Sequence, residues 1–559
     1  MGYRGERYLS EPEVREAYRV LAESAPEWTT LETVGETREG RPIQLLTIGD
    51  QTGDPAARPA FWIDAGTHAA EWTGVMTALY SATTWVDALC AGDEALVHWF
   101  KAHTVYVVPN LSPDGFAAMR DGAPFLRSTL RPPRDGRPRV GLDPSDLDGD
   151  GAVRWMRWPH PTGTWVFDDP KNSAKMRWRT LDDDPADAYH VASEGTFLSW
   201  DGVSWTSAGW AHGLDLNRNF PVAWAPFEMF GMDGGDYPLS EPESRAAVEA
   251  FRARPRIAAA ITHHTYTGCL LTPPYRDPSP LPTTDVDLMN ELAMEAAEGT
   301  GYRVYKVVPD FVYDKNQSIV GVWADAMAAT FGVPGYTLEL WDPYKFAGRE
   351  VDKPAELFKR PDLDLLHAVL DAFLEEPGAI VPWKPFDHPQ LGPVELGGIA
   401  YQTTIRNPPE RLLAEECERG HTVTDRLRRA LPRVEVELHV HRVSAGTSRV
   451  ELVVENLGYL ASGGLKHAEG IGVAPPIVAT LSLSDGLTLE DGAEAQNLGW
   501  LEGWGSLRAA GHNHPIYPGL PVTGGVRTRA VWWVTGAGEV RVEWDAGRAG
   551  AGHVGSAIA

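Results

Sequence analysis

His68 and Glu71 stand three positions apart in the motif His68-Ala-Ala-Glu71, and both are metal-ligating residue types. The motif follows a compact apolar run, Ala60–Ala65, and precedes a stretch with helical periodicity at 72–89. Because the backbone turns between a strand and a helix, both side chains can point into one crevice and converge on one ion. The pair alone is a weak signal, because chance should produce roughly one such match in a chain with many histidines.

Other short motifs occur around this pair in a fixed order along the chain. They are Glu39-Gly-Arg41, Ser112-Pro-Asp-Gly-Phe116, Asp215-Leu-Asn-Arg-Asn-Phe-Pro221, Ser240-Glu-Pro-Glu243, His264-Thr-Tyr266 and Thr337-Leu-Glu-Leu340. With these motifs, the chain from residue 8 to about residue 374 resembles the M14 zinc carboxypeptidase family. Each motif is modest by itself, but the combination is specific.

The resemblance implies three zinc ligands, His68, Glu71 and His264. In the family a later His-x-Tyr motif at the end of a strand supplies the third ligand, so Tyr266 favours His264 over its neighbour His263. A strand-end histidine pair satisfied by backbone carbonyls is the structural alternative. Three protein ligands leave one position of a tetrahedral zinc ion free for water, as a catalytic site requires.

The resemblance also implies the groups that bind and cleave the substrate. Asn217 and Arg218 match the family's anchor for the terminal carboxylate, and a guanidinium group can bind a carboxylate through two hydrogen bonds. Glu339 matches the family's catalytic glutamate, which takes a proton from water and delivers it to the leaving amine. A surface arginine between turn-forming asparagines and a strand glutamate facing solvent are the alternatives that the residues leave open.

Two further roles of the family do not map to a single residue. The arginine that polarises the scissile carbonyl should lie between Glu71 and Asn217, and we predict Arg157. Its competitors in this interval are Arg120, Arg127, Arg131 and Arg154. The mobile tyrosine expected before the catalytic glutamate is Tyr313, if the chain has one. Ser112 stands where the family usually has asparagine, which puts the shape of that loop in question.

Asp146, Asp148 and Asp150 resemble the opening of a calcium-binding loop, with acidic residues at alternate positions and a glycine for the turn. The twelfth position is Arg157 instead of the bidentate glutamate, which excludes a standard EF-hand. An irregular calcium site and a plain acidic turn both remain, and the plain turn is favoured.

The elements that must position these residues alternate between strands and helices. Apolar runs predict strands at 30–50 (two strands around a turn), Ala60–Ala65, 103–109, 256–262 and 336–341, and helical periodicity predicts helices at 11–25, 72–89, 286–297 and 363–374. This alternation indicates an α/β fold with a buried sheet. The resemblance implies a mixed-sheet zinc carboxypeptidase-like α/β/α domain over residues 1–385.

The remaining segments differ from this domain in composition and in the periodicity of their apolar residues. Residues 130–213 are rich in Pro, Gly, Asp and Trp without clear periodicity, so we predict an irregular insertion there. Residues 386–432 are predicted to be a linker with a helix at 407–430. Short alternating runs with Gly and Asp turns then predict a C-terminal all-β sandwich domain over 433–559.

Length and composition restrict the class of protein. A chain of 559 residues is too long for one hydrophobic core, and its net charge of −27 disfavours nucleic acid or anionic membranes as partners. The N-terminus lacks the apolar stretch of a secretory signal, and no run is long enough to span a membrane. The three cysteines are few, odd in number and far apart, which argues against a disulfide framework. We expect a cytoplasmic protein, or a secreted one if a leader was removed.

These observations predict a zinc metallocarboxypeptidase that acts on peptides or proteins with a free C-terminal carboxylate. One alternative is a zinc amidohydrolase acting on an acyl-amino acid or a cell-wall peptide, and Asn217 with Arg218 argues against the acyl-amino acid version. Another is a non-catalytic peptide- or glycan-binding protein, against which Glu339 and the ligand set argue. The preferred side chain depends on loops such as 304–325 and is not predicted, nor is the oligomeric state.

Overall fold

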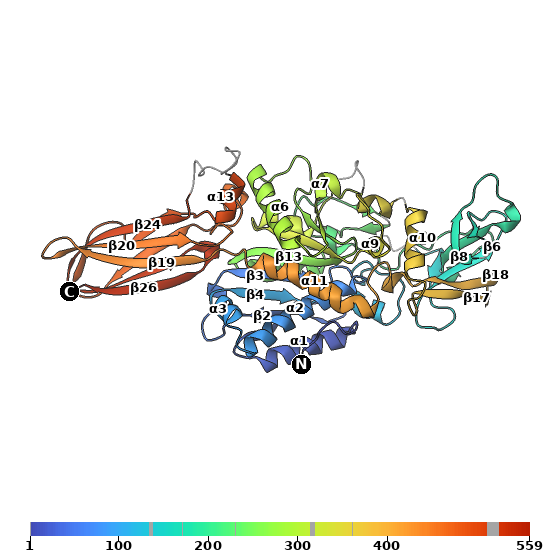
Figure 1. Cartoon of the computed structure of the whole chain (residues 1–559), viewed down its shortest axis with the longest axis horizontal. Coiled ribbons are helices and arrows are strands. Elements are labelled where there is room, and N and C mark those ends of the chain that lie inside the picture. Colours follow the sequence, from blue (N-terminus) through green and yellow to red (C-terminus); the bar gives the residue numbers. More distant parts are fainter. Residues whose placement is uncertain are drawn as a thin grey trace.

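The main domain is built on an eight-stranded sheet. The computed structural model of the chain describes residues 2–132, 138–169, 172–229, 231–313, 319–359, 361–510 and 525–558. The strands of this sheet are β1 (Thr29–Glu36), β2 (Pro42–Ile48), β3 (Ala60–Ala65), β4 (Thr104–Val108), β13 (Ile257–Thr265), β14 (Cys269–Thr272), β15 (Arg303–Lys306) and β16 (Gly335–Leu340). They lie in the order β1-β2-β4-β3-β13-β16-β14-β15, of which β2, β4, β3 and β13 are labelled in Figure 1. The pairs β4–β3, β3–β13, β13–β16 and β14–β15 are parallel, so the sheet is mixed.

Helices cover both faces of this sheet. They include α1 (Glu11–Ser24), α2 (Trp72–Cys90), α3 (Glu94–Ala102), α4 (Pro113–Arg120), α5 (Pro242–Arg252), α6 (Thr283–Ala297) and α11 (Glu410–Arg428). The predicted helix at 363–374 is α10 (Leu363–Ala372), which packs against β8 (Asn172–Trp178). Alternate residues of β3 divide between two hydrophobic clusters: Phe61 and Ile63 pack with α1, α2, α6 and α11, whereas Trp62 packs with α5. This is the buried mixed sheet of the predicted carboxypeptidase-like α/β fold. No helix in the described ranges is long and apolar enough to cross a membrane.

A second sheet is formed by residues for which the sequence predicted an irregular insertion and the start of a linker. Its strands are β6 (Trp155–Pro159), β7 (Trp165–Asp169), β8 (Asn172–Trp178), β9 (Tyr189–Ser193), β17 (Ile380–His388) and β18 (Gly392–Ile399). They lie in the order β17-β18-β6-β9-β7-β8, at the right of Figure 1. Pro382 and Pro385 made β17 difficult to predict from the sequence, because proline within a run argues against a strand. An edge strand tolerates proline, because its outer backbone donors need no partner strand.

The segment predicted to be a linker belongs to the packed structure. The helix expected at 407–430 is α11, and its residues Leu413, Cys417 and Val423 are fully buried in the hydrophobic cluster that also contains α2. Residues 399–409, which we call the latch segment, connect the end of β18 to α11. They bring the chain back to the main sheet after the second sheet is complete.

The C-terminal region contains two four-stranded antiparallel sheets. Their strands are β19 (Val434–Arg442), β20 (Thr447–Asn456), β21 (Ile477–Leu483), β22 (Leu487–Asp491), β23 (Ala495–Gly499), β24 (Arg527–Gly536), β25 (Gly538–Asp545) and β26 (Ala551–Ile558). The orders are β19-β20-β24-β22 and β23-β21-β25-β26. Val450 and Trp532 from the first sheet and Ile477 and Val542 from the second belong to one hydrophobic cluster.

Two arginines tie the C-terminal region to the main domain. Arg548 is 6% exposed and donates hydrogen bonds to the backbone oxygens of Ile257 at 2.8 Å and Phe331 at 2.6 Å. Arg256, just before β13, pairs with both carboxylate oxygens of Asp545 at 2.9 Å. The C-terminal sheets are therefore fixed at the start of β13, and Figure 1 shows them at the end of the molecule opposite the second sheet.

Candidate metal centre and cleft

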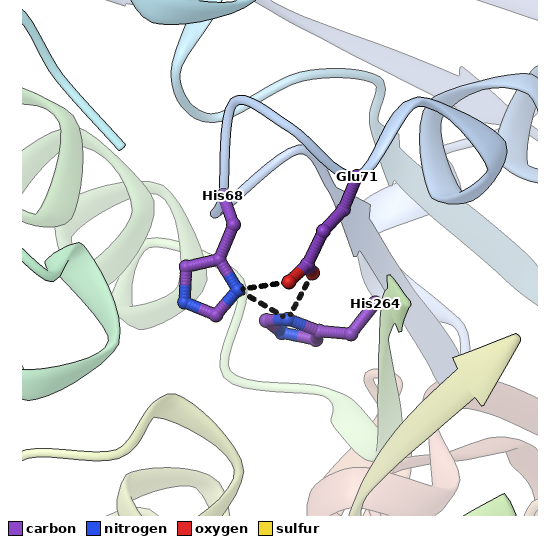
Figure 2. Close-up of side chains that lie close together, drawn as sticks. All are labelled: His68, Glu71 and His264. Carbon is purple, nitrogen blue, oxygen red and sulfur yellow. Dashed lines mark hydrogen bonds and ion pairs between the residues drawn. The ribbon is translucent and has the colours of Figure 1, made fainter. Parts of the chain in front are cut away.

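His68, Glu71 and His264 lie together, with their donor atoms facing one another (Figure 2). The Nδ1 atom of His68 is 2.9 Å from Oε1 of Glu71 and 3.0 Å from Nδ1 of His264. The same Nδ1 of His264 is 2.9 Å from Oε2 of Glu71. All three residues are buried. Two ring nitrogens and one carboxylate therefore point to a common position.

Neighbouring side chains hold both imidazole rings in this orientation. Nε2 of His68 lies 3.2 Å from Oδ1 of Asp215, and Nε2 of His264 lies 3.2 Å from Oγ1 of Thr262. A hydrogen bond at the second ring nitrogen fixes the tautomer and leaves the first nitrogen free to bind a metal. Each histidine thus has the second partner that metal-binding histidines usually have.

The local chain explains why these residues meet. The turn at residues 66–71, which we call the His-Glu turn, follows β3, and His264 lies near the end of the parallel neighbour β13, so both stand at the same edge of the sheet. Gly74 lets α2 approach β13 closely, because a Cβ atom there would lie 2.8 Å from the backbone oxygen of His263. The side chain of His263, the rival ligand, contacts Oγ1 of Thr424 in α11 at 3.0 Å, on the other face of the sheet.

The electrostatics of the cluster suit a metal site. Burial alone would raise the pKa of the Glu71 carboxyl, but the charges and hydrogen bonds of His68 and His264 hold it well below its ordinary value. Burial lowers the pKa of His264, which favours the neutral imidazole that binds metals. All the donor atoms lie within 4.8 Å of one another. Two imidazoles and one carboxylate are a donor set that zinc accepts, so these residues fit a zinc ion.

Glu339 lies beside this cluster on the next strand. The strand β16 runs parallel to β13, and Glu339 is the register partner of His264. Its side chain lines the same cleft as Glu71. Burial, and after it the negative charge of Glu71, raises the pKa of Glu339 well above its ordinary value. A carboxyl group with a raised pKa can accept and return a proton near neutral pH.

The structure corrects the predicted carbonyl-polarising arginine. Arg157 lies in β6 of the second sheet, where its Nε donates to Glu395 at 2.7 Å and its guanidinium group covers three aromatic rings. It is not among the described residues that line the cleft, because packing inside the second sheet holds it. Arg127 reaches the cluster instead. Its Nη1 lies 3.2 Å from Oε1 of Glu71, and its Nε lies 3.2 Å from Oδ2 of Asp215.

Two of the three predicted substrate-binding residues, Arg218 and Tyr313, line the cleft, and Asn217 is not among its described lining residues. Arg218 lines the cleft, is 5% exposed, makes no ion pair within the described ranges and lies 5.0 Å from the ring centre of Phe227. Tyr313 also lines the cleft, and burial raises its pKa to about 12. Asn217 is behind the cleft wall, where its side-chain oxygen accepts a hydrogen bond from the backbone amide of Trp323 at 2.9 Å.

One cleft of about 1050 Å³ connects these groups. Glu71, Asp215 and Glu339 lie on its surface, and its walls come from the main domain, the insertion and the latch segment. Its aromatic lining consists of Trp72, Phe125, Trp155, Trp210, Phe227, Tyr266, Phe311, Tyr313, Phe358 and Tyr401. Such a cleft has the size and apolar character of a ligand site. Part of the predicted specificity loop, residues 314–318, lies outside the described residues.

The predicted calcium site has no support. The carboxylate of Asp146 accepts hydrogen bonds from two backbone amides of its own loop, at 2.7 and 2.9 Å. Asp148 accepts another such amide, and Asp150 pairs with Arg154 at 2.9 Å. The carboxylate of the nearby Glu194 likewise accepts backbone amides. These acids shape an acidic turn, as the absence of the bidentate glutamate indicated.

Sequence reasoning missed two charged groups of the site. Asp215 orients His68, and its position at the start of the motif containing Arg218 was the signal that could have identified it. Arg406 belongs to the latch segment, and its Nη1 lies 3.5 Å from Oε1 of Glu71. It lies beyond the region that resembles the family, and no spacing in the sequence connects it to the other motifs.

Comparisons with known proteins agree with this geometry. The family model described as zinc carboxypeptidase matches residues 14–352, more than half of the chain. The chain therefore belongs to the zinc carboxypeptidase family. A second model, described as a domain of unknown function (DUF8731), matches residues 433–554. The latch segment lies between the two matched ranges.

The relatives are distant and match only in part. Carboxypeptidase A4 of Mus musculus is 33% identical over 125 residues, which are 22% of this chain and 29% of that protein. The inactive metallocarboxypeptidase ECM14 of Arthroderma benhamiae is 30% identical over 144 residues, 24% of this chain and 23% of that protein. The chain thus spans less than a third of the length of these curated relatives. A structure of bovine thrombin-activatable fibrinolysis inhibitor in complex with tick carboxypeptidase inhibitor has 16% identity and a TM-score of 0.43, covering 76% of this chain and 97% of that chain.

Proposed function

We propose that the chain is a zinc-dependent metallocarboxypeptidase that hydrolyses the C-terminal peptide bond of peptides or proteins. The observation that carries the proposal is the meeting, in one cleft, of a zinc-type donor set, the buried carboxyl group of Glu339 and the buried guanidinium group of Arg218. Arg218 donates a hydrogen bond to the backbone oxygen of Asn217 but has no ion pair with an acidic residue within the described ranges. Because an inactive relative exists, family membership alone does not establish catalysis. The proposal therefore rests on these side chains.

In this proposal Arg218 selects the end of the peptide. A guanidinium group without an acidic partner, held in a mostly enclosed site, binds a carboxylate strongly and in a fixed orientation. Asn217 supports the turn that carries Arg218, through its bond to the backbone of Trp323. Tyr313 lines the wall beside the terminal residue of the substrate. A free terminal carboxylate is therefore required, which restricts cleavage to the last peptide bond.

The remaining side chains carry out the bond cleavage. Zinc, held by His68, Glu71 and His264, would supply a Lewis acid and lower the pKa of a water molecule. Arg127, fixed by two carboxylates, donates hydrogen bonds to the oxygen of the scissile carbonyl as negative charge develops there. Glu339 takes the proton from the attacking water and returns it to the leaving amine.

The test compares one peptide as its free acid and as its C-terminal amide, with the metal content of the protein measured in parallel. We expect one zinc ion per chain and hydrolysis of the free acid at a rate at least about 100-fold above that of the amide, because the amide offers Arg218 no charge. Equal cleavage of both forms would favour a zinc amidohydrolase. Binding without cleavage of either form would favour a non-catalytic peptide-binding protein.

We also propose that the C-terminal region is a β-sandwich. Residues of both sheets share one hydrophobic cluster, and buried and half-exposed residues alternate along β20, as in two sheets packed face to face. Trp532 is fully buried in this cluster. Trp532→Ala should therefore destabilise both sheets by about 3–5 kcal/mol. Hydrogen exchange that accelerates in only one of the two sheets would contradict the proposal.

A further inference from the structure

The latch segment is fastened to the His-Glu turn. Asn407 is fully buried, and its Nδ2 donates hydrogen bonds to the backbone oxygens of Ala70 at 2.9 Å and Gln402 at 3.0 Å. Its Oδ1 accepts hydrogen bonds from the backbone amide and the hydroxyl group of Thr73, both at 3.0 Å. The Asn407 side chain therefore connects the latch segment to the residues on both sides of Glu71, and Gln402 of the same segment also donates a hydrogen bond to the backbone oxygen of Ala70.

Arg406 points from this segment into the cleft. It is 8% exposed, and its guanidinium group lies 5.0 Å from the ring centre of Tyr266, 5.7 Å from that of Phe125 and 5.8 Å from that of Tyr401. Within the described part of the chain its one acidic partner is Glu71, at 3.5 Å, and its buried Nε has no hydrogen-bond partner. The residue is therefore a buried cation with unused donor capacity at the cleft surface.

The charge inside the cleft favours an additional anion. Six arginines and four acidic residues are among the described lining residues. They are Arg120, Arg127, Arg139, Arg154, Arg218 and Arg406, and Glu71, Asp143, Asp215 and Glu339. This excess of positive charge contrasts with the net charge of −27 of the whole chain. When Glu71 serves as a metal ligand, as the proposed function requires, Arg406 has no other ion-pair partner among the described residues, although Glu339 interacts with it at longer range. A buried charge without a close partner is costly.

The position of Arg406 indicates which part of the substrate it meets. Arg218 has Phe227 beside it, whereas Arg406 has Phe125, Tyr266 and Tyr401, so the two guanidinium groups share no aromatic neighbour. Within the cluster, Glu71 contacts Arg406, whereas His68 contacts Asp215, whose pKa the charges of Arg127 and Arg218 help to lower. A substrate anchored at Arg218 and cleaved at the cluster therefore extends its preceding residue toward Arg406.

We infer that Arg406 binds a second carboxylate of the substrate, carried by the side chain of the residue just before the cleaved bond. This inference rests on the proposed function and adds a substrate class to it, namely peptides with Glu or Asp at the second position from the C-terminus. The Nε of the guanidinium group, which has no hydrogen-bond partner among the described residues, can form a charge-assisted hydrogen bond with such a carboxylate. The surrounding aromatic rings exclude water and strengthen this bond.

The experiment measures binding to the metal-loaded, full-length Glu339→Gln protein by calorimetry. The probes are the peptides acetyl-Ala-Glu-Phe and acetyl-Ala-Gln-Phe as free acids, which differ only in the charge before the last bond. We expect the Glu peptide to bind about tenfold more tightly, and Arg406→Gln in the same background to abolish this difference. Arg154→Gln is the matched control, because Arg154 lines the same cleft but already pairs with Asp150. It should leave the tenfold preference unchanged.

Several outcomes would overturn the inference. The first is equal binding of the two peptides by the Glu339→Gln protein, which is the parent of the other variants. The second is a preference for the Glu peptide that survives in Arg406→Gln. The third is an equal loss of affinity for both peptides in Arg406→Gln, which would assign Arg406 to a main-chain contact. Because Arg406 is buried, Arg406→Lys is a second variant, and its preference should fall between those of the parent and Arg406→Gln. A lysine variant with the full preference would also overturn the inference. Failure of the wild-type protein to cleave peptides would refute the proposed function, but it would leave this binding comparison intact.

Discussion

The His-Glu turn and the latch segment meet at one cleft, but they are built in different ways. The His-Glu turn follows a strand of the main sheet, and the parallel neighbour β13 brings His264 to the same edge. The latch segment follows the second sheet and lies outside the matched range 14–352. Hydrogen bonds from the side chains of Asn407 and Gln402 to the backbone of Ala70 hold it against the His-Glu turn.

This difference separates two kinds of contribution to function. Strand ends place the reacting groups, because the spacing of parallel strands is set by backbone hydrogen bonds and changes little with sequence. The latch segment contributes a wall and one cation, Arg406, which can vary without disturbing the main sheet. We therefore expect substitutions in the family-matched region to affect the chemical step most. Substitutions in the latch segment should mainly affect selectivity and stability.

The largest effect is expected for Glu339→Gln. The amide cannot accept a proton, so hydrolysis should fall by about 10²–10⁴-fold or more while zinc stays bound, because Glu339 is not a ligand. Single-turnover kinetics and metal analysis on the same sample measure both quantities. Asp143→Asn is the control, since Asp143 lines the cleft but pairs with Arg139 away from the cluster. Full activity in Glu339→Gln would contradict the role of Glu339 in proton transfer.

The next largest effect is expected for Arg127→Met. Loss of a donor to the developing negative charge should lower kcat by about 10²–10³-fold with a smaller change in KM. Arg157→Met is the informative comparison, because this arginine was the choice from sequence and packs in the second sheet. It should reduce the melting temperature and leave kcat close to that of the wild type. If the two variants changed kcat in the opposite order, the assignment of Arg127 would be wrong.

The sequence predicted the main sheet and the cluster of His68, Glu71 and His264 because both leave periodic or spaced signals. Strand-to-helix alternation indicated the α/β fold, and the motifs at Glu71 and His264 mark strand ends. Other motifs prove to be structural: Arg41 pairs with Asp114 at 2.8 Å and fastens the β1–β2 hairpin to α4. A short motif can therefore identify a family without belonging to the active site.

The second sheet and the latch segment could not be predicted, for two physical reasons. The strands β6, β7 and β9 of the second sheet have five residues each, and the sheet joins residues 155–193 to residues 380–399, so neither half shows a pattern alone. The Asn407 side chain helps to hold the latch segment by bonding to the backbone of Ala70 and Thr73, a contact that requires no particular residue type in its partners. These long-range pairings place Arg157 in the second sheet and leave Arg127 in the cleft, so the sequence alone did not show which of the two arginines lies near the cluster.

The smallest effect on chemistry, with a clear effect on stability, is expected for Asn407→Ala. Four hydrogen bonds of a buried amide are lost, so the free energy of unfolding should fall by about 1–3 kcal/mol. Asn456→Ala is a matched control, because Asn456 is 2% exposed and also makes four such bonds, but in the C-terminal region. Denaturant unfolding should show a similar loss of stability in both variants. Only Asn407→Ala should weaken the preference that depends on Arg406, because Asn407, unlike Asn456, bonds the latch segment to the His-Glu turn. Equal selectivity in the two variants would mean that the latch segment keeps its position without Asn407.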